Sequence, residues 1–113
     1  MAILYKIIDK QSWDQACHKG LFSGAAIDLR DGYIHLSTAT QVRETARLHF
    51  AGVTDLLLVA IDESQVSANL KWEASRGGQL FPHVYGEIAT ALAMWAKPLP
   101  WNDVEHEFPV ELS

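Results

Sequence analysis

The segment Asp55-Leu56-Leu57-Leu58-Val59-Ala60-Ile61 is the most apolar stretch of the chain and decides its fold class. It predicts a buried strand, because a strand covered on both faces shows a continuous apolar run in place of polar and apolar alternation. Residues 3–8 have the same character, with largely apolar side chains in both phases of the alternation. The chain therefore supplies two strands that need packing partners on both faces.

Two helices are expected, and each begins with a capping box. The boxes are residues 12–15 and 38–41, where a Ser or Thr stands three residues before a Gln. Cys17 falls on the apolar side of the first helix, which predicts a packed side chain rather than a reactive thiol. His49 falls on the apolar side of the second helix, which predicts a hydrogen-bonded histidine in the core. Residues 20–32 are rich in turn formers and separate the first helix from the next strand.

Shorter strands make up the rest of the predicted sheet. Pro82 cannot donate a hydrogen bond to a neighbouring strand, so residues 81–85 are expected at an edge or an irregular position. Residues 62–68 predict a turn or a short helix, and Gly77-Gly78 predicts a flexible loop. The expected strands cover residues 33–37, 70–74, 81–85 and a stretch that ends at Lys97.

The charges of the 113-residue chain are unevenly distributed. Nine Lys and Arg residues against 14 Asp and Glu residues give a net charge of -5. Four of the acidic residues (Asp103, Glu105, Glu107 and Glu111) lie in residues 101–113, which contain no Lys or Arg. We therefore expect one globular domain over residues 1–100, followed by an acidic C-terminal tail over residues 101–113.

Several classes of protein are excluded by these patterns. No cluster of basic residues is present to neutralise phosphates, so nucleic acid is not an expected partner. The longest apolar run, Leu56 to Ile61, is far shorter than the roughly 20 residues of a membrane helix, so no membrane partner is expected. A single cysteine and the lack of a secretory signal predict a cytoplasmic location. No metal-ligand spacing or phosphate-loop motif occurs, and His18 and His106 are expected to be exposed.

Reactive side chains alternate with apolar ones on three of the expected strands. His35 and Ser37 share one face of the strand at 33–37, and His83 and Tyr85 share one face of the strand at 81–85. Glu73 lies on the strand between them in sequence. Such groups are the materials of acid and base catalysis, and on a concave sheet face they would line a ligand pocket. The alternative is a half-exposed antiparallel sheet whose polar face simply contacts water.

Three motifs carry a resemblance to a known family. They are Asp31-Gly32-Tyr33-Ile34-His35-Leu36-Ser37, Leu70-Lys71-Trp72-Glu73 and Phe81-Pro82-His83-Val84-Tyr85-Gly86. With them the sequence resembles the bacterial family catalogued as domain of unknown function 952, from about Ile3 to Pro98. Glu87 stands where a Pro is expected after the Tyr-Gly pair. The family is remotely similar to ADP-ribosyltransferase-like folds, which implies an α+β protein with a mixed, split β-sheet and short helices packed on it.

The resemblance also implies roles for the cleft residues in an ADP-ribosyl transfer that uses NAD or a related nucleotide. His35 and Ser37 would hydrogen-bond a ribose or a nicotinamide amide, and Tyr85 would stack on a planar ring. Glu73 would stabilise the cationic sugar centre, and His83 would contact phosphate or move a proton. Glu73 and His83 are thus the expected catalytic residues, and His35, Ser37 and Tyr85 the expected ligand-binding residues.

Two other functions remain open at this stage. A non-catalytic module could bind a nucleotide or another small metabolite in the same cleft. An interaction protein could instead use Trp95 and Trp101, which flank the Pro98–Pro100 exit from the domain, as an adhesive surface. The sequence fixes neither the ligand nor the oligomeric state.

Overall fold

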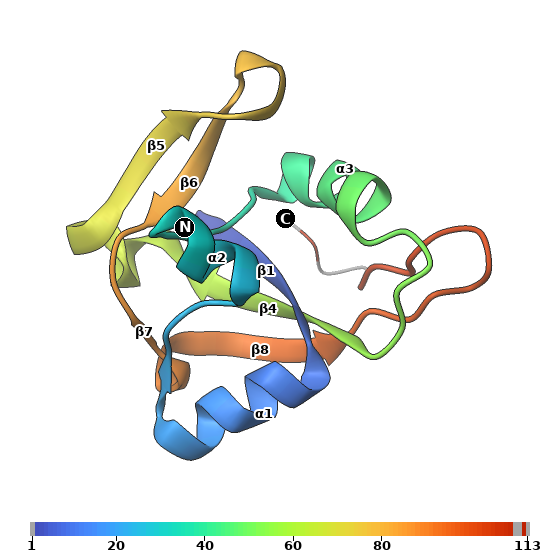
Figure 1. The fold of residues 1–113 in the computed structure, drawn as a ribbon, viewed down its shortest axis with the longest axis horizontal. Coiled ribbons are helices and arrows are strands. Elements are labelled where there is room, and N and C mark those ends of the chain that lie inside the picture. The colour runs from blue at the N-terminus through green and yellow to red at the C-terminus, as the bar shows by residue number, and fades with distance from the viewer. Residues whose placement is uncertain (1, 110–111, 113) are drawn as a thin grey trace.

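The structure is a computed structural model and describes residues 2–109 and 112. Eight strands, three α-helices and four 3₁₀ turns lie in this part of the chain (Figure 1). The strands are β1 (Ile3–Asp9), β2 (Leu21–Phe22), β3 (Ile34–His35), β4 (Leu56–Asp62), β5 (Leu70–Ala74), β6 (Leu80–Val84), β7 (Ile88–Ala89) and β8 (Ala93–Pro98). The helices are α1 (Lys10–Lys19), α2 (Ala26–Asp31) and α3 (Ala39–His49). The 3₁₀ turns are Glu63–Gln65, Ser67–Asn69, Arg76–Gly78 and Thr90–Leu92.

The largest sheet has the strand order β1-β4-β8 and is covered on both faces. The first core, on one face, includes Leu4, Ile8, Val59, Ile61 and Trp13 of α1. The second core, on the other face, includes Tyr5, Ile7, Leu58, Val42 and Ala46, of which the last two belong to α3. The predicted burial is thus confirmed for residues 56–61, of which Leu57 is half-buried, and for residues 4–8, and it explains why neither segment alternates. Asp55 is exposed and lies before β4. Each fully buried aliphatic side chain contributes about 1.5–3 kcal/mol to folding.

The fold is α+β, with short helices and three small sheets. Besides β1-β4-β8, the sheets are β2-β7 and β3-β6-β5. The prediction of a mixed sheet was wrong, because every strand pairing among the described residues is antiparallel. The β5–β6 hairpin and α1 lie at opposite ends of the molecule (Figure 1).

The sheet β3-β6-β5 contacts the main sheet where the chain leaves β3 and passes β1. Ser37 forms an isolated bridge with Tyr5 of β1, with N–H···O distances of 2.8 and 2.9 Å. The edge position expected for residues 81–85 was wrong, because β6 is the middle strand. Pro82 is tolerated there since β3 ends at His35, and Pro82 only accepts a hydrogen bond, from the N–H of Leu36 at 3.0 Å.

The helices begin close to where the sequence predicted, with two corrections. The Asp9 carboxylate caps α1 by accepting from the N–H of Ser12, so Asp9 takes the capping role that was expected of Ser12. Cys17 is exposed and not packed, because Trp13 and Ala16 are the buried residues of α1. At α3 the predicted box is present, and the N–H of Thr38 donates to Gln41 at 3.0 Å. No helix in the described part of the chain is long and apolar enough to cross a membrane.

Residues 20–32, expected to be turns, contain the short helix α2, and the segment after β8 folds back towards α3. Leu99 is fully buried, and Phe108 packs against the second core and lies below the guanidinium of Arg43. His106 is 6% exposed, and its Nε2–H donates to the carbonyl of Val53 at 2.9 Å. The prediction of an exposed His106 was therefore wrong, whereas His18 is exposed as predicted.

Candidate functional site

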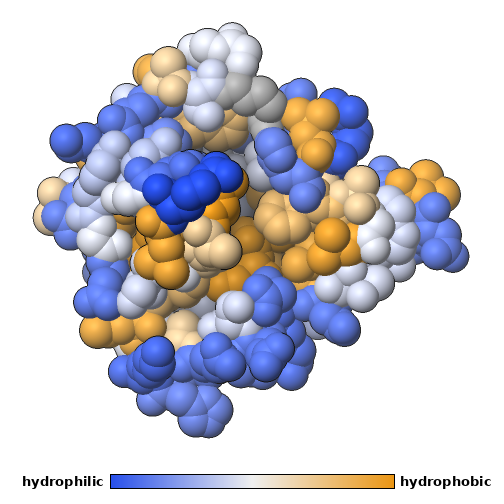
Figure 2. Space-filling view, viewed as in Figure 1, coloured by the Kyte–Doolittle hydropathy of each residue, from blue (hydrophilic) through white to orange (hydrophobic). Residues whose placement is uncertain are grey.

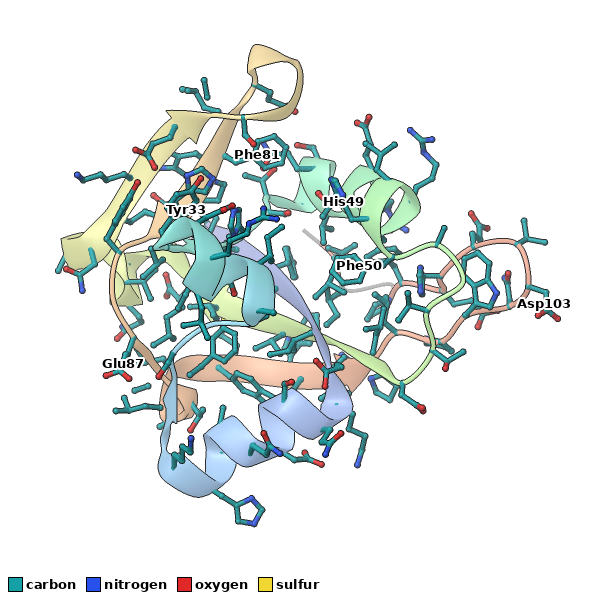
Figure 3. The ribbon with its side chains drawn as sticks, viewed as in Figure 1. Tyr33, His49, Phe50, Phe81, Glu87 and Asp103 are labelled. Atoms are coloured by element: carbon teal, nitrogen blue, oxygen red, sulfur yellow. The ribbon has the colours of Figure 1, made fainter. Side chains whose placement is uncertain are left out.

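A small pocket opens where the two larger sheets meet α3. Its volume is about 150 Å³, and it is lined by Tyr5, Lys6, Ile7, Ile27, His35, Leu36, Ser37, Thr45, His49, Phe50, Ser75, Phe81 and His83. Figure 2 shows apolar residues around a hollow in the middle of this face, between α2 and α3. Phe81 of the hairpin lies across this space from His49 and Phe50 (Figure 3). The pocket is thus mostly apolar, with a few polar side chains in its wall.

His83 is held in the pocket wall by Glu73. Its Nδ1 lies 2.8 Å from Glu73 Oε1, and since a carboxylate only accepts, Nδ1–H is the donor. No described residue hydrogen-bonds the other ring nitrogen, Nε2. The described residues contain no fully buried side-chain nitrogen or oxygen without a partner, so Nε2 keeps some access to solvent although the side chain is only 3% exposed. His83 is one of the residues that line the pocket, and its Nε2 carries a lone pair because the ring proton lies on Nδ1.

Tyr85 and Tyr33 complete the surroundings of His83. The Tyr85 hydroxyl donates to the same Glu73 oxygen at 2.7 Å. Hydrogen bonds from His83 and Tyr85 lower the pKa of Glu73, and the bond to Glu73 raises the pKa of Tyr85 to about 12. The Tyr33 ring stacks on the His83 ring, with centroids 4.2 Å apart. The orientation of the His83 ring is therefore fixed by its hydrogen bond to Glu73 and by the stacked Tyr33 ring, while Tyr85 holds the Glu73 carboxylate in place.

His35 belongs to a second cluster of charged groups. Its Nδ1 lies 2.7 Å from Asp28 Oδ1, and its Nε2 lies 3.0 Å from Asp31 Oδ2. Asp28 also accepts from Lys6 Nζ at 2.9 Å and from the backbone N–H of Ala25 and of His35. The cluster therefore ties β1, α2 and β3 together, and it engages both ring nitrogens of His35.

Burial sets the electrostatics of this second cluster. Asp28 is 1% exposed, and burial alone would raise its pKa. The hydrogen bond from His35 and the charge of Lys6 outweigh burial and hold the pKa of Asp28 at about 2. For Lys6 burial is the larger effect, and it lowers the pKa of the ammonium group despite the neighbouring carboxylate.

The remaining candidate, Ser37, lies at the floor of the pocket. It is 6% exposed, and its hydroxyl lies 3.3 Å from that of Thr45 on α3. Its backbone pairs with Tyr5, as described above. Ser37 therefore contributes to the pocket wall through a hydroxyl that already has a protein partner.

The structure brings four of the five predicted residues into one group of contacts. The centroids of the His35 and His83 rings lie 5.4 Å apart. His83 and Tyr85 both donate hydrogen bonds to Glu73. Ser37 shares the pocket with both histidines but does not join their hydrogen bonds. Glu73 and Tyr85 do not line the pocket, and they reach it only through His83.

Sequence reasoning missed several residues of the site. Asp28 and Asp31 lie in a segment that was expected to be turns, and Lys6 lies in a buried strand. Lys6 carried a usable signal, since it is the single charged residue between the apolar positions of residues 3–8. His49 was predicted to be in the core, but it is exposed and lines the pocket, because the buried residues of α3 are Gln41, Val42 and Ala46 and His49 lies at the edge of their face. Among the described residues, no group of three or more His, Cys, Asp or Glu could hold a metal ion.

The comparisons with known proteins identify the family. Residues 7–96 match the family model described as "Protein of unknown function (DUF952)". The chain belongs to the DUF952 family. The crystal structure of protein CC0527 from Caulobacter crescentus is 40% identical, with 93% of each chain covered and a TM-score of 0.88. The solution NMR structure of CC0527 is 39% identical, with 92% of this chain and 90% of that chain covered and a TM-score of 0.82.

These findings confirm the predicted DUF952 membership and leave its chemistry open. No curated protein matches the chain. None of the matches bears on the remote similarity to ADP-ribosyltransferase-like folds, which stays a prediction. What this DUF952 protein does must therefore be argued from its own pocket.

Proposed function

We propose that the pocket binds a small metabolite by one planar ring and that His83 exchanges a proton with this ligand at Nε2. The observation that carries the proposal is the position of His83, whose Nδ1–H is fixed by Glu73 while Nε2 has no hydrogen-bond partner among the described residues. An imidazole held this way accepts a proton at one nitrogen without changing its orientation, which is what a general base requires.

The volume of the pocket limits how much of a ligand the pocket can enclose. A cavity of about 150 Å³ accommodates a molecule of roughly the size of benzene. Pockets that enclose whole drug-sized ligands are larger, about 300–1,000 Å³. A single aromatic or heteroaromatic ring fits, whereas a complete dinucleotide does not. An ADP-ribosyl-type transferase is the specific form of the proposal that the family resemblance implies. NAD or a related nucleotide would then insert only one ring.

The geometry changes the role proposed for Glu73 in such an enzyme. Its carboxylate is bonded to His83 and Tyr85 and does not line the pocket, so it acts on a ligand through His83 and not by direct contact. His35 likewise has both nitrogens engaged with carboxylates, which leaves its ring edge and backbone to shape the wall. His83 is therefore the residue that we propose to be catalytic.

A non-catalytic binding module is the second candidate, because the apolar wall alone can retain a ring. The interaction-protein alternative has less support. Trp95 packs against the second core and lies below the ammonium group of Lys97, and Trp101 stacks against His106. Neither indole is a free adhesive surface.

The test is a titration of isotope-labelled protein with nicotinamide, NAD and ADP-ribose, followed by amide NMR shifts. We expect at least nicotinamide or NAD to shift residues around the pocket, including Ser37, Phe50 and Phe81. Shifts confined to residues outside the pocket lining, or the absence of any shift, would contradict the proposal.

A substitution then separates the enzyme from the binding module. His83→Asn keeps a polar side chain but removes the base, so an enzyme retains ligand affinity and loses turnover by on the order of 100-fold. A binding module instead loses affinity. His18→Asn, on the exposed surface of α1, is the matched control and should change neither quantity.

A further inference from the structure

We infer that Glu73 is a proton relay that connects His83 in the pocket to solvent on the outer face of the β5–β6 hairpin. This inference rests on the proposed function, since it concerns the proton that His83 takes from a ligand. The two residues differ in access to water. The side chain of His83 is 3% exposed, whereas that of Glu73 is 38% exposed. The 2.8 Å hydrogen bond between them therefore crosses from the pocket wall to the surface.

The hydrogen bonds of Glu73 suit a relay because they leave one oxygen free. Both His83 Nδ1 and the Tyr85 hydroxyl donate to Oε1. No described residue hydrogen-bonds Oε2, which is available to water. The raised pKa of Tyr85 and the lowered pKa of Glu73 agree with this arrangement, since the phenol remains a donor and the carboxylate remains an acceptor at neutral pH.

The other ionisable groups around His83 do not offer an equivalent path. Tyr33 contacts the face of the His83 ring and not its nitrogens. His35 has both nitrogens engaged with the carboxylates of α2. Lys71 lies opposite His83 in the pairing of β5 with β6, and its ammonium group lies over the Tyr85 ring. In the described part of the chain, Glu73 is therefore the one carboxylate bonded to His83.

The proposed transfer moves one proton from the ligand to water. The ligand loses a proton to Nε2, and His83 becomes a cation that still carries its proton on Nδ1. The Nδ1 proton passes to Glu73 and from there to water, which leaves His83 neutral with its proton on Nε2. The starting tautomer returns when Nδ1 takes up one proton from water through Glu73 and Nε2 gives its proton to the product or to water in the pocket. No oxidant, reductant or further reactant is required.

The experiment measures how fast the Nδ1 proton of His83 exchanges with water in the ligand-free protein, by NMR on histidine labelled with nitrogen-15. Glu73→Gln should slow this exchange by on the order of 100-fold, because the amide oxygen still accepts from Nδ1–H but cannot take up the proton. In Glu73→Ala, added formate should raise the exchange rate by entering the vacated position, whereas chloride at equal ionic strength should not. A merely structural role for Glu73 predicts no such rescue.

A third variant keeps the test decisive. Tyr85→Phe retains the bond between Glu73 and His83, so its exchange rate should remain close to that of the wild type. Glu73→Gln keeps a partner on Nδ1–H as well, so the difference in exchange rate between Glu73→Gln and Tyr85→Phe isolates proton uptake by the carboxylate even if Glu73→Ala fails to fold. A wild-type rate in the folded Gln variant would overturn the relay. Because no ligand is present, that result is independent of whether the titration above detects binding.

Discussion

The molecule contains two clusters in which carboxylates hold an imidazole, and they differ in what they leave free. In the cluster of Asp28, Asp31 and His35, both ring nitrogens are engaged and the central carboxylate is 1% exposed. In the cluster of Glu73 and His83, the described residues engage Nδ1 and not Nε2, and the carboxylate is partly exposed. The same pair of residue types thus ties β1, α2 and β3 together in one place and leaves a ring nitrogen without a described partner in the other.

The difference shows that a histidine next to a carboxylate is not in itself a sign of catalysis. A saturated imidazole can only hold its neighbours, whereas one with an open nitrogen can exchange protons with a ligand. Substitutions in the two clusters should therefore affect different properties. Those at Asp28 should act on stability, and those at Glu73 should act on proton exchange.

The largest expected effect on stability comes from Asp28→Asn. This substitution leaves the ammonium group of Lys6 buried without its counter-ion, and breaking a buried ion pair from one side costs about 3–5 kcal/mol. The measurement is the free energy of unfolding in urea. Glu73→Gln is the matched control, and it should change this free energy much less because its side chain is partly exposed. Equal losses in the two variants would remove the distinction between the clusters.

A smaller effect should appear on acidification. The pKa of Asp28 is about 2 in the folded protein against 3.8 ordinarily, so the ionised form is favoured by folding. Its contribution is fully present above about pH 4 and is lost as the pH falls towards 2, on the order of 2 kcal/mol in total. Urea unfolding at a series of pH values should show this loss in the wild type. The slope should be shallower in Asp28→Asn, and an identical slope would show that Asp28 is not responsible.

The smallest expected effect is spectroscopic and lies in the other cluster. Glu73→Gln removes the negative charge that accepts from Tyr85, so the pKa of Tyr85 should fall from about 12 towards its ordinary value of 10.0. NMR of ring-labelled tyrosine, titrated against pH, follows this single residue. An unchanged titration of Tyr85 would mean that its hydroxyl does not bond to Glu73 in solution.

The main sheet could be predicted because the burial of its strands is evident from their apolar composition. Residues 56–61 have no polar side chain, which is typical of a strand buried on both faces. The face-sharing of His35 with Ser37 and of His83 with Tyr85 followed from strand periodicity alone. How Glu73 would meet His83 did not, because that contact depends on the register of β5 against β6.

The parts that escaped prediction depend on long-range contacts. The helix α2 has six residues, and Asp28 within it is held by Lys6, 22 residues earlier in the chain, which no local pattern reports. Cys17 and His49 lie at the margins of their helices' apolar faces, where a small change in helix orientation decides between burial and exposure. The His106 hydrogen bond to Val53 spans 53 residues and is equally invisible to local analysis.

The bridge between Tyr5 and Ser37 limits the depth of the pocket. Both residues line the pocket, and their two backbone hydrogen bonds tie this part of its wall to the main sheet. A ring that entered more deeply would have to separate these strands, and so it would work against the pairing between Tyr5 and Ser37. Substitutions of side chains elsewhere in the wall should therefore alter the shape of the pocket far more readily than its depth.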